Sequence, residues 1–284
     1  MTRERVLHDL EIENARVSDL LYDDFNAYQA NFDAAGEDSA HQDLRASFLS
    51  WTMIFAREVF PPDLALEIAR FVRSAEDRDD YSHYGWHNTL HLRAGIFVLT
   101  GNEEWIQLHL GNLAHHSSSL RGYVARSLAP VIHLVSSSEL DGPICTNLEK
   151  WHFFNDYPLS LFIAADGDPS YKLLRLSEWA QQYPDGNDTK LLASLSSGEP
   201  IENPFAAQFR RVERYVLLRL CSRPQQVPIQ RVASWGEPAS EAGMRHYPDA
   251  HVDANVILER MENHPLSGEL IETPKDPNTL TTAR

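Results

Sequence analysis

Cysteine is scarce in this chain. It has two, Cys145 and Cys221, which lie far apart with no second thiol near either. The closely spaced cysteine pairs that bind metals or exchange disulfides are therefore absent. Both cysteines fall within apolar helical patterns, where a reduced cysteine packs like a small hydrophobic residue. We interpret them as core residues rather than as catalytic nucleophiles.

Long apolar runs are also lacking. No stretch approaches the roughly 18–20 uninterrupted apolar residues that a membrane-spanning helix needs. The segment 1–14 carries two arginines followed by acidic residues, without the apolar stretch of a secretory signal. We therefore expect a cytoplasmic protein that has no membrane partner.

The common catalytic and cofactor motifs are missing as well. The sequence contains no GxSxG, GxGxxG, Walker A, CxxC or HExxH pattern. These motifs place nucleophiles, phosphate-binding backbone or metal ligands, so the sequence predicts no cofactor. It favours a binding role over an enzymatic one and leaves the question of an enzyme open.

Basic residues are few, and lysine is the rarer kind. The chain has 41 acidic and 25 basic residues, which gives a net charge of −16, and only four of the basic residues are lysines. The first hundred residues hold 18 acidic and 9 basic residues, whereas residues 201–284 hold 11 and 10. Such a field repels nucleic acid and attracts basic proteins. We expect a basic protein partner and no nucleic acid; ordinary solubility is the alternative explanation.

What the sequence does contain is helical periodicity along most of its length. One segment has its apolar stripe, at steps of three or four residues, at Leu44, Phe48, Trp51, Phe55 and Val59. Strand signals are confined to segments 131–135 and 227–232, and neither has a partner run or a hairpin turn. The pattern predicts an all-α fold of about ten helices joined by short loops.

Helix ends are marked by glycine, asparagine, aspartate and proline. Gly101 is typical of a helix C-terminus because glycine adopts the left-handed conformation there, and Asn102 can cap the helix that follows. The pairs Gly142-Pro143 and Asp168-Pro169 place proline where a first helical residue is expected, so each predicts a helix start.

The composition changes near residue 224. We predict a helical domain over residues 1–223 and a loop-rich C-terminal extension over 224–284, with one short helix and a mobile tail. Two architectures stay open for the helical domain: a multi-helix bundle and an irregular HEAT-like α-solenoid. The segment 119–131 is similar to the second helix of a HEAT-type repeat, but no second copy is visible.

Histidines at positions 83, 87 and 91 fall on one face of a predicted helix. Two neighbours four residues apart could share a metal ion, so His87 and His91, with His115 from the next helix, are candidate ligands. Tyr84 stands where an HExxH helix has its glutamate. The stripe borders the apolar face, where hydrogen-bonded structural histidines are common, and we favour that structural interpretation over the metal site.

The acidic run at 76–80 is too highly charged to belong to a core. We predict that it binds a basic partner together with a nearby tryptophan, through Glu76, Asp77, Asp79, Asp80 and Trp86. A solvated face and a hard-cation site are the alternatives.

Five arginines, at positions 210, 211, 214, 219 and 223, lie on the predicted helix over 204–223. The planar guanidinium group suits carboxylates. We therefore predict that these arginines pair with the acidic N-terminal helices, inside the chain or across a homodimer.

The charge and the predicted architecture favour an acidic helical module that docks or inhibits a basic protein. A bacterial immunity protein that neutralises a toxin encoded beside it is one case. A metal-assisted hydrolase with a histidine cluster between helices is one alternative. A solenoid scaffold that binds peptides is another.

Overall fold

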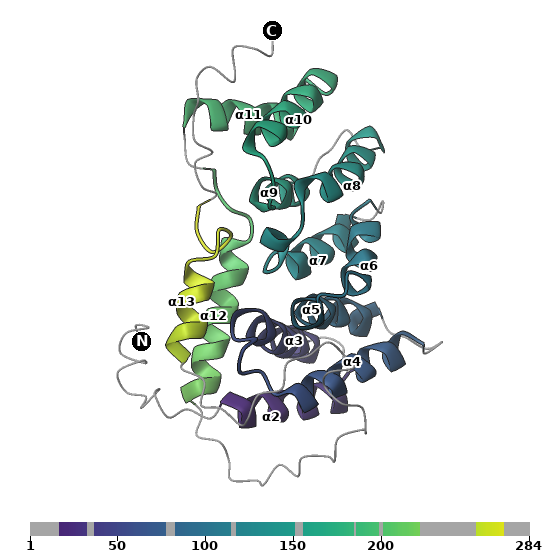
Figure 1. The fold of residues 1–284 in the computed structure, drawn as a ribbon, viewed down its shortest axis with the longest axis vertical. Coiled ribbons are helices and arrows are strands. Elements are labelled where there is room, and N and C mark those ends of the chain that lie inside the picture. The colour runs from purple at the N-terminus through teal and green to yellow at the C-terminus, as the bar shows by residue number, and fades with distance from the viewer. Residues whose placement is uncertain are drawn as a thin grey trace. The chain divides into compact units, whose positions relative to one another are not determined.

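The structure is a computed structural model, and it contains α-helices without a strand in the part of the chain that it describes (Figure 1). The described residues are 17–32, 37–77, 83–114, 118–150, 156–184, 186–198, 201–221 and 254–269. They form twelve α-helices and one 3₁₀ turn, which confirms the predicted all-α class. Among these helices none has the length and apolar character that crossing a membrane requires.

The helices fall into two compact units. Unit 1 comprises residues up to Ile106 and Arg210–Asn263, and unit 2 comprises Gln107–Phe209 and the residues from His264 onward. Unit 1 holds α2 (Val17–Ala30), α3 (Glu37–Phe55), α4 (Pro62–Glu76), α5 (His83–Thr100), the start of α6 (Glu104–Leu113), most of α12 (Ala206–Cys221), and α13 (Ala254–Glu262). Unit 2 holds the rest of α6, then α7 (Ser118–Leu128), η2 (Ile132–Leu134), α8 (Ser137–Lys150), α9 (Asp156–Ala164), α10 (Pro169–Gln182) and α11 (Asn187–Ser197). The predicted boundary at residue 224 lies outside the described residues and stays a prediction, as does the solenoid alternative.

Several helix ends follow the local signals of the sequence. Gly101 ends α5 with a φ of 67°, and its N–H donates to the Phe97 carbonyl oxygen at 2.8 Å. The Asn102 Oδ1 accepts from the Glu104 N–H at 3.0 Å and so caps α6. Asp168 caps α10 in the same way, with its Oδ1 2.9 Å from the Ser170 nitrogen. These three predictions are confirmed.

The predicted helix start at Pro143 is wrong, because α8 begins six residues earlier at Ser137. Ser136 and Glu139 form a capping box there: the Glu139 carboxylate accepts from the Ser136 N–H at 3.0 Å, and the Ser136 hydroxyl accepts from the Ser138 N–H at 3.3 Å. Pro143 therefore lies inside α8. The segment 131–135, whose strand signal had no partner run, contains the 3₁₀ turn η2, in agreement with the predicted all-α class.

The core of unit 1 is built around the close packing of α3 against α5. Gly95 allows this approach, because a Cβ atom at that position would lie 2.7 Å from the Met53 Cε and 3.1 Å from the Ser50 Cα. On another side of the unit, Phe71 of α4 makes edge-to-face contacts with three aromatic rings of the α2 segment, with centroids 5.1–5.8 Å apart.

Unit 2 is held together by aromatic packing and by backbone contacts between loops. Phe162 of α9 packs against Trp179 of α10 with ring centroids 5.0 Å apart. The Ser137 N–H donates to the Asp166 carbonyl oxygen at 2.8 Å, which joins the start of α8 to the loop after α9. The Lys172 amino group donates to the carbonyl oxygens of Ile163 and Ala165 and so satisfies the C-terminal end of α9.

The segment after α13 is anchored in unit 2 by a buried histidine. His264 is 6% exposed, and its ring stacks on Phe209 with centroids 4.9 Å apart. Its Nδ1 accepts from the Leu266 N–H at 3.1 Å. Burial, and next the neighbouring His133, lower the pKa of His264 to about 3. The ring is therefore neutral in the folded chain at neutral pH.

We expect Gly95→Ala to lower the free energy of unfolding by roughly 1–3 kcal/mol, because the added methyl group overpacks the α3–α5 contact. Gly111 provides the matched control, since it is exposed in α6 and a Cβ atom there meets nothing within 4 Å. Gly111→Ala should stabilise by about 0.5–1 kcal/mol through helix propensity. Urea unfolding followed by circular dichroism measures both; equal stabilisation by the two substitutions would contradict the predicted close contact.

We expect acid to destabilise the chain through His264. The unfolded ring has an ordinary pKa near 6.5, so the unfolded state binds the proton first as the pH falls. The stabilising contribution is complete above pH 6.5 and is lost towards the folded pKa of about 3, at up to about 1.4 kcal/mol per pH unit. His264→Gln should flatten the dependence of unfolding free energy on pH between pH 7 and 5 in urea titrations. Parallel curves for the two proteins would refute this assignment.

Candidate functional site

A single arginine ties three helices of unit 1 together. The Arg93 guanidinium on α5 donates to both carboxylate oxygens of Glu76 on α4, at 2.7 and 2.9 Å. Its Nε and its second terminal nitrogen donate to the carbonyl oxygens of Trp105 and Glu104, at 3.1 and 3.0 Å. Arg93 is buried, and hydrogen bonds between its guanidinium and a carboxylate are of the strong, charge-assisted kind.

An aromatic ring completes this corner. Trp105 is 5% exposed, and the guanidinium carbons of Arg73 and Arg93 lie 5.0 and 5.2 Å from the centroid of its ring. Arg73 also lies 3.9 Å from the Glu104 carboxylate. Cations over an indole ring are stabilised by its quadrupole. The end of α4 and the start of α6 are therefore held in one arrangement.

Four carboxylates gather at this corner: Glu76, Asp77, Glu103 and Glu104, which we call the acidic edge. Glu76 is paired with Arg93, whereas the other three side chains are exposed. Asp77 is the C-terminal cap residue of α4. A carboxylate there faces the negative end of the helix dipole, which is an unfavourable place for it. Two arginines at this corner, Arg73 and Arg93, balance half of the four negative charges.

The structure describes only some of the residues that we predicted to bind a partner. Glu76 and Asp77 lie on the acidic edge, while Asp79 and Asp80 lie outside the described residues. Trp86 lies in the first turn of α5, and its side chain is not among those described. Arg93 and Trp105 were missed by the sequence reasoning. A lone arginine within the apolar run from 90 to 99 was the available signal, since a buried arginine needs a carboxylate partner.

The structure describes two of the three candidate metal ligands, His87 and His91. His87 and His91 are each 2% exposed, and the His91 Nε2 lies 3.1 Å from the Asp43 Oδ1. His115 lies outside the described residues. In the described part of the chain no group of three potential ligands could hold a metal ion. The His91–Asp43 contact is typical of the hydrogen-bonded structural histidine that we favoured.

Two of the arginines on α12 pair with acidic residues of the N-terminal helices, as predicted. Arg219 lies 2.8 Å from the Asp24 Oδ1, and the Tyr215 hydroxyl donates to the Asp24 Oδ2 at 2.8 Å. Arg211 lies 3.6 Å from the Asp43 Oδ2. Burial raises the pKa of Asp24 although Arg219 and the Tyr215 hydrogen bond act against it. Burial and the Asp24 carboxylate together raise the pKa of Tyr215.

The same neutralisation recurs on α13, where the Arg260 guanidinium lies 3.1 Å from the Glu58 carboxylate. Asp24 of α2, Asp43 of α3 and Glu58 after α3 are therefore each paired inside unit 1 with an arginine of α12 or α13. The acidic edge differs from these pairs, because three of its four carboxylates stay exposed. Among the described residues it gathers three exposed carboxylates in one place, where their charge is available to another molecule.

We expect Arg219→Met to destabilise the chain by about 2–4 kcal/mol, because Asp24 is 3% exposed and would keep a buried charge without its cation. The double variant Asp24→Asn with Arg219→Met should recover part of this loss, since the uncompensated charge is gone. Arg214→Met is the control on the same helix: Arg214 is exposed, and its change should stay within about 0.5 kcal/mol. Denaturant titration measures all three; a double variant no more stable than Arg219→Met would contradict the pairing.

No protein-family model, curated protein or solved structure matches the chain. The geometry of the corner supplies the functional interpretation instead. Fixed, exposed carboxylates can attract and orient a cationic surface.

Proposed function

We propose that this protein binds a basic protein partner through the acidic edge and blocks the partner's working surface by covering it. The observation that carries the proposal is the rigid presentation of exposed carboxylates. Asp77, Glu103 and Glu104 project from a corner that Arg93 holds together through four hydrogen bonds.

A rigid docking surface favours binding because it loses little conformational entropy when the partner docks. Ordering a flexible side chain at an interface costs roughly 0.5–1.5 kcal/mol. The backbone at this corner is already fixed by the buried Arg93 side chain and by the packing of Trp105. Charged side chains mounted on a fixed backbone give orientation as well as attraction.

The charge of the whole chain supports fast association. A net charge of −16 raises the local concentration of a cationic partner and speeds its encounter. The unfavourable position of Asp77 at the end of α4 fits this proposal too, because a cation docking there would relieve the repulsion between its carboxylate and the helix dipole.

Neutralisation of a toxin is the form of this function that we propose. A nuclease or another basic effector carries a cationic working surface, and an acidic protein that covers it abolishes access to the substrate. The proposal places this activity in the cytoplasm, with the toxin encoded by the adjacent gene.

The test is co-expression with the tagged product of the adjacent gene, followed by affinity purification and a titration of binding against salt. We expect a stable complex in about 0.15 M salt that weakens as salt rises, because screening shortens the reach of the carboxylates. The double variant Asp77→Lys with Glu103→Lys should bind at least about ten-fold more weakly, since like charges then face each other.

The control carries the same change of net charge elsewhere in unit 1. Asp63 and Glu259 are both exposed, and Asp63→Lys with Glu259→Lys should retain binding within about three-fold if the edge is the docking surface. Equal weakening by both double variants would mean that only net charge matters. The absence of any complex with the unaltered protein would overturn the proposal.

A further inference from the structure

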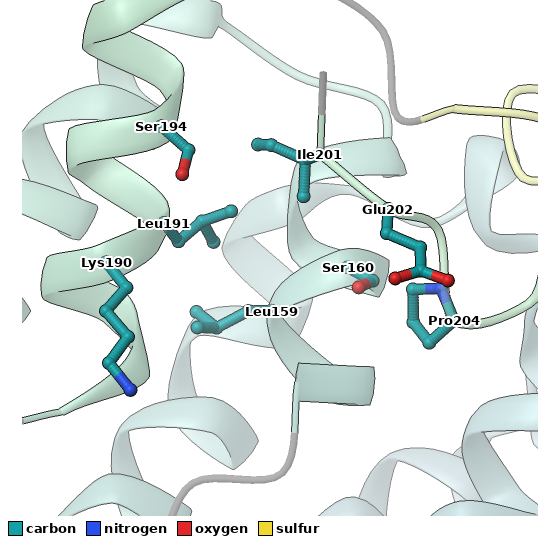
Figure 2. A pocket seen from close by; sticks show the side chains of 8 residues that line it. All are labelled: Leu159, Ser160, Lys190, Leu191, Ser194, Ile201, Glu202 and Pro204. Atoms are coloured by element: carbon teal, nitrogen blue, oxygen red, sulfur yellow. The ribbon is translucent and has the colours of Figure 1, made fainter. Parts of the chain in front are cut away.

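Unit 2 contains a hollow with a volume of about 550 Å³ (Figure 2). It lies between α9, α11 and the segment 201–204, all of which belong to the same unit. Its volume falls within the range of about 300–1,000 Å³ that is typical of ligand sites. None of its lining residues takes part in the acidic edge.

The centre of the hollow is apolar. The side chains of Leu159, Leu191 and Ile201 extend toward its middle from three different elements (Figure 2). Leu191 and Ile201 are only half-buried, so part of their apolar surface is still accessible. Covering such surface stabilises a complex by about 25 cal/mol for each Å² removed from water.

Two opposite charges flank this apolar centre. Lys190 of α11 lies on one side and Glu202 on the other, with the Ser160 hydroxyl near the Glu202 carboxylate (Figure 2). Both charged side chains are exposed. Within the described residues neither forms an ion pair, so each is available to a charged group of a ligand.

We propose that this hollow binds a short peptide that carries a basic residue and an acidic residue on either side of apolar side chains. The basic residue pairs with Glu202, the acidic residue pairs with Lys190, and the apolar side chains cover the accessible surface of Leu191 and Ile201. Each charge of the ligand therefore lies opposite a charge of the other sign in the hollow.

The separation of the two charges favours a peptide of mixed charge over a free amino acid and over a ligand with charges of one sign. In a free amino acid the ammonium and carboxylate groups are separated by one carbon, whereas here three apolar side chains lie between Lys190 and Glu202 (Figure 2). A phosphate-rich ligand would be repelled by Glu202, and a purely basic peptide by Lys190. A short peptide satisfies both charges because its side chains reach different parts of a site.

The test uses the full-length protein and tetrapeptides with blocked ends, so that only side chains carry charge. Isothermal titration calorimetry compares KLLE with KLLK and ELLE. We expect KLLE to bind at least about ten-fold more tightly than either of the others, since it alone matches both charges. Glu202→Lys should shift the preference to ELLE, and Lys190→Glu should shift it to KLLK.

Glu259→Lys is the matched control for Glu202→Lys. It makes the same charge change at an exposed position of unit 1 and should keep the preference of the unaltered protein for KLLE. Glu202 and Glu259 are both exposed, and circular dichroism verifies that the variants stay folded. The milder Glu202→Gln should also lose the preference for KLLE over ELLE. The proposal is overturned if no tetrapeptide binds at millimolar concentration, or if the preference is the same in the unaltered protein and all variants. The test is independent of the adjacent-gene complex, because it uses neither that partner nor the acidic edge.

Discussion

Unit 1 depends on the neutralisation of one buried carboxylate. Asp24 on α2 is 3% exposed, and an isolated carboxylate at that depth would cost several kcal/mol in lost hydration. Arg219 and the Tyr215 hydroxyl, each 2.8 Å from it, compensate that cost. Tyr215 is 191 positions away from Asp24 in the sequence, so α12 must return to α2 for unit 1 to form. The fold of the N-terminal helices is therefore completed by a segment that follows most of unit 2 in the chain.

This constraint separates the acidic residues that pair with α12 or α13 from the exposed carboxylates of the acidic edge. Asp24, Asp43 and Glu58 each lie within 4 Å of an arginine of α12 or α13, and their charge is used to close the unit. Within the described residues, the exposed carboxylates of the acidic edge form no ion pair with an arginine of α12 or α13. A count of charges along the sequence does not distinguish paired from exposed carboxylates. The net charge of the first hundred residues therefore overstates the negative charge that a partner can contact.

What the sequence predicted correctly is mostly local. Gly101, Asn102 and Asp168 end or begin helices through contacts with residues four or fewer positions away, so their roles are readable without the fold. The prediction at Pro143 failed because the capping box at Ser136 and Glu139, also local, was overlooked. The pairing of α12 arginines with N-terminal acids followed from charge, but the particular partners did not. Arg93 and the lining of the hollow depend on which helices meet, and that is decided by packing across distant parts of the chain.

The two candidate binding surfaces illustrate different ways of gaining affinity. The acidic edge offers exposed charge over a buried tryptophan, so its attraction acts at a distance and weakens with salt. The hollow offers apolar side chains between two single charges, so most of its affinity would come from covering Leu191 and Ile201, and the charges would mainly select the ligand. Long-range attraction suits a large basic surface that must be captured quickly. Short-range apolar contact suits a small segment that must be recognised by its sequence, and a helical protein can carry both because each needs only a few residues on separate elements.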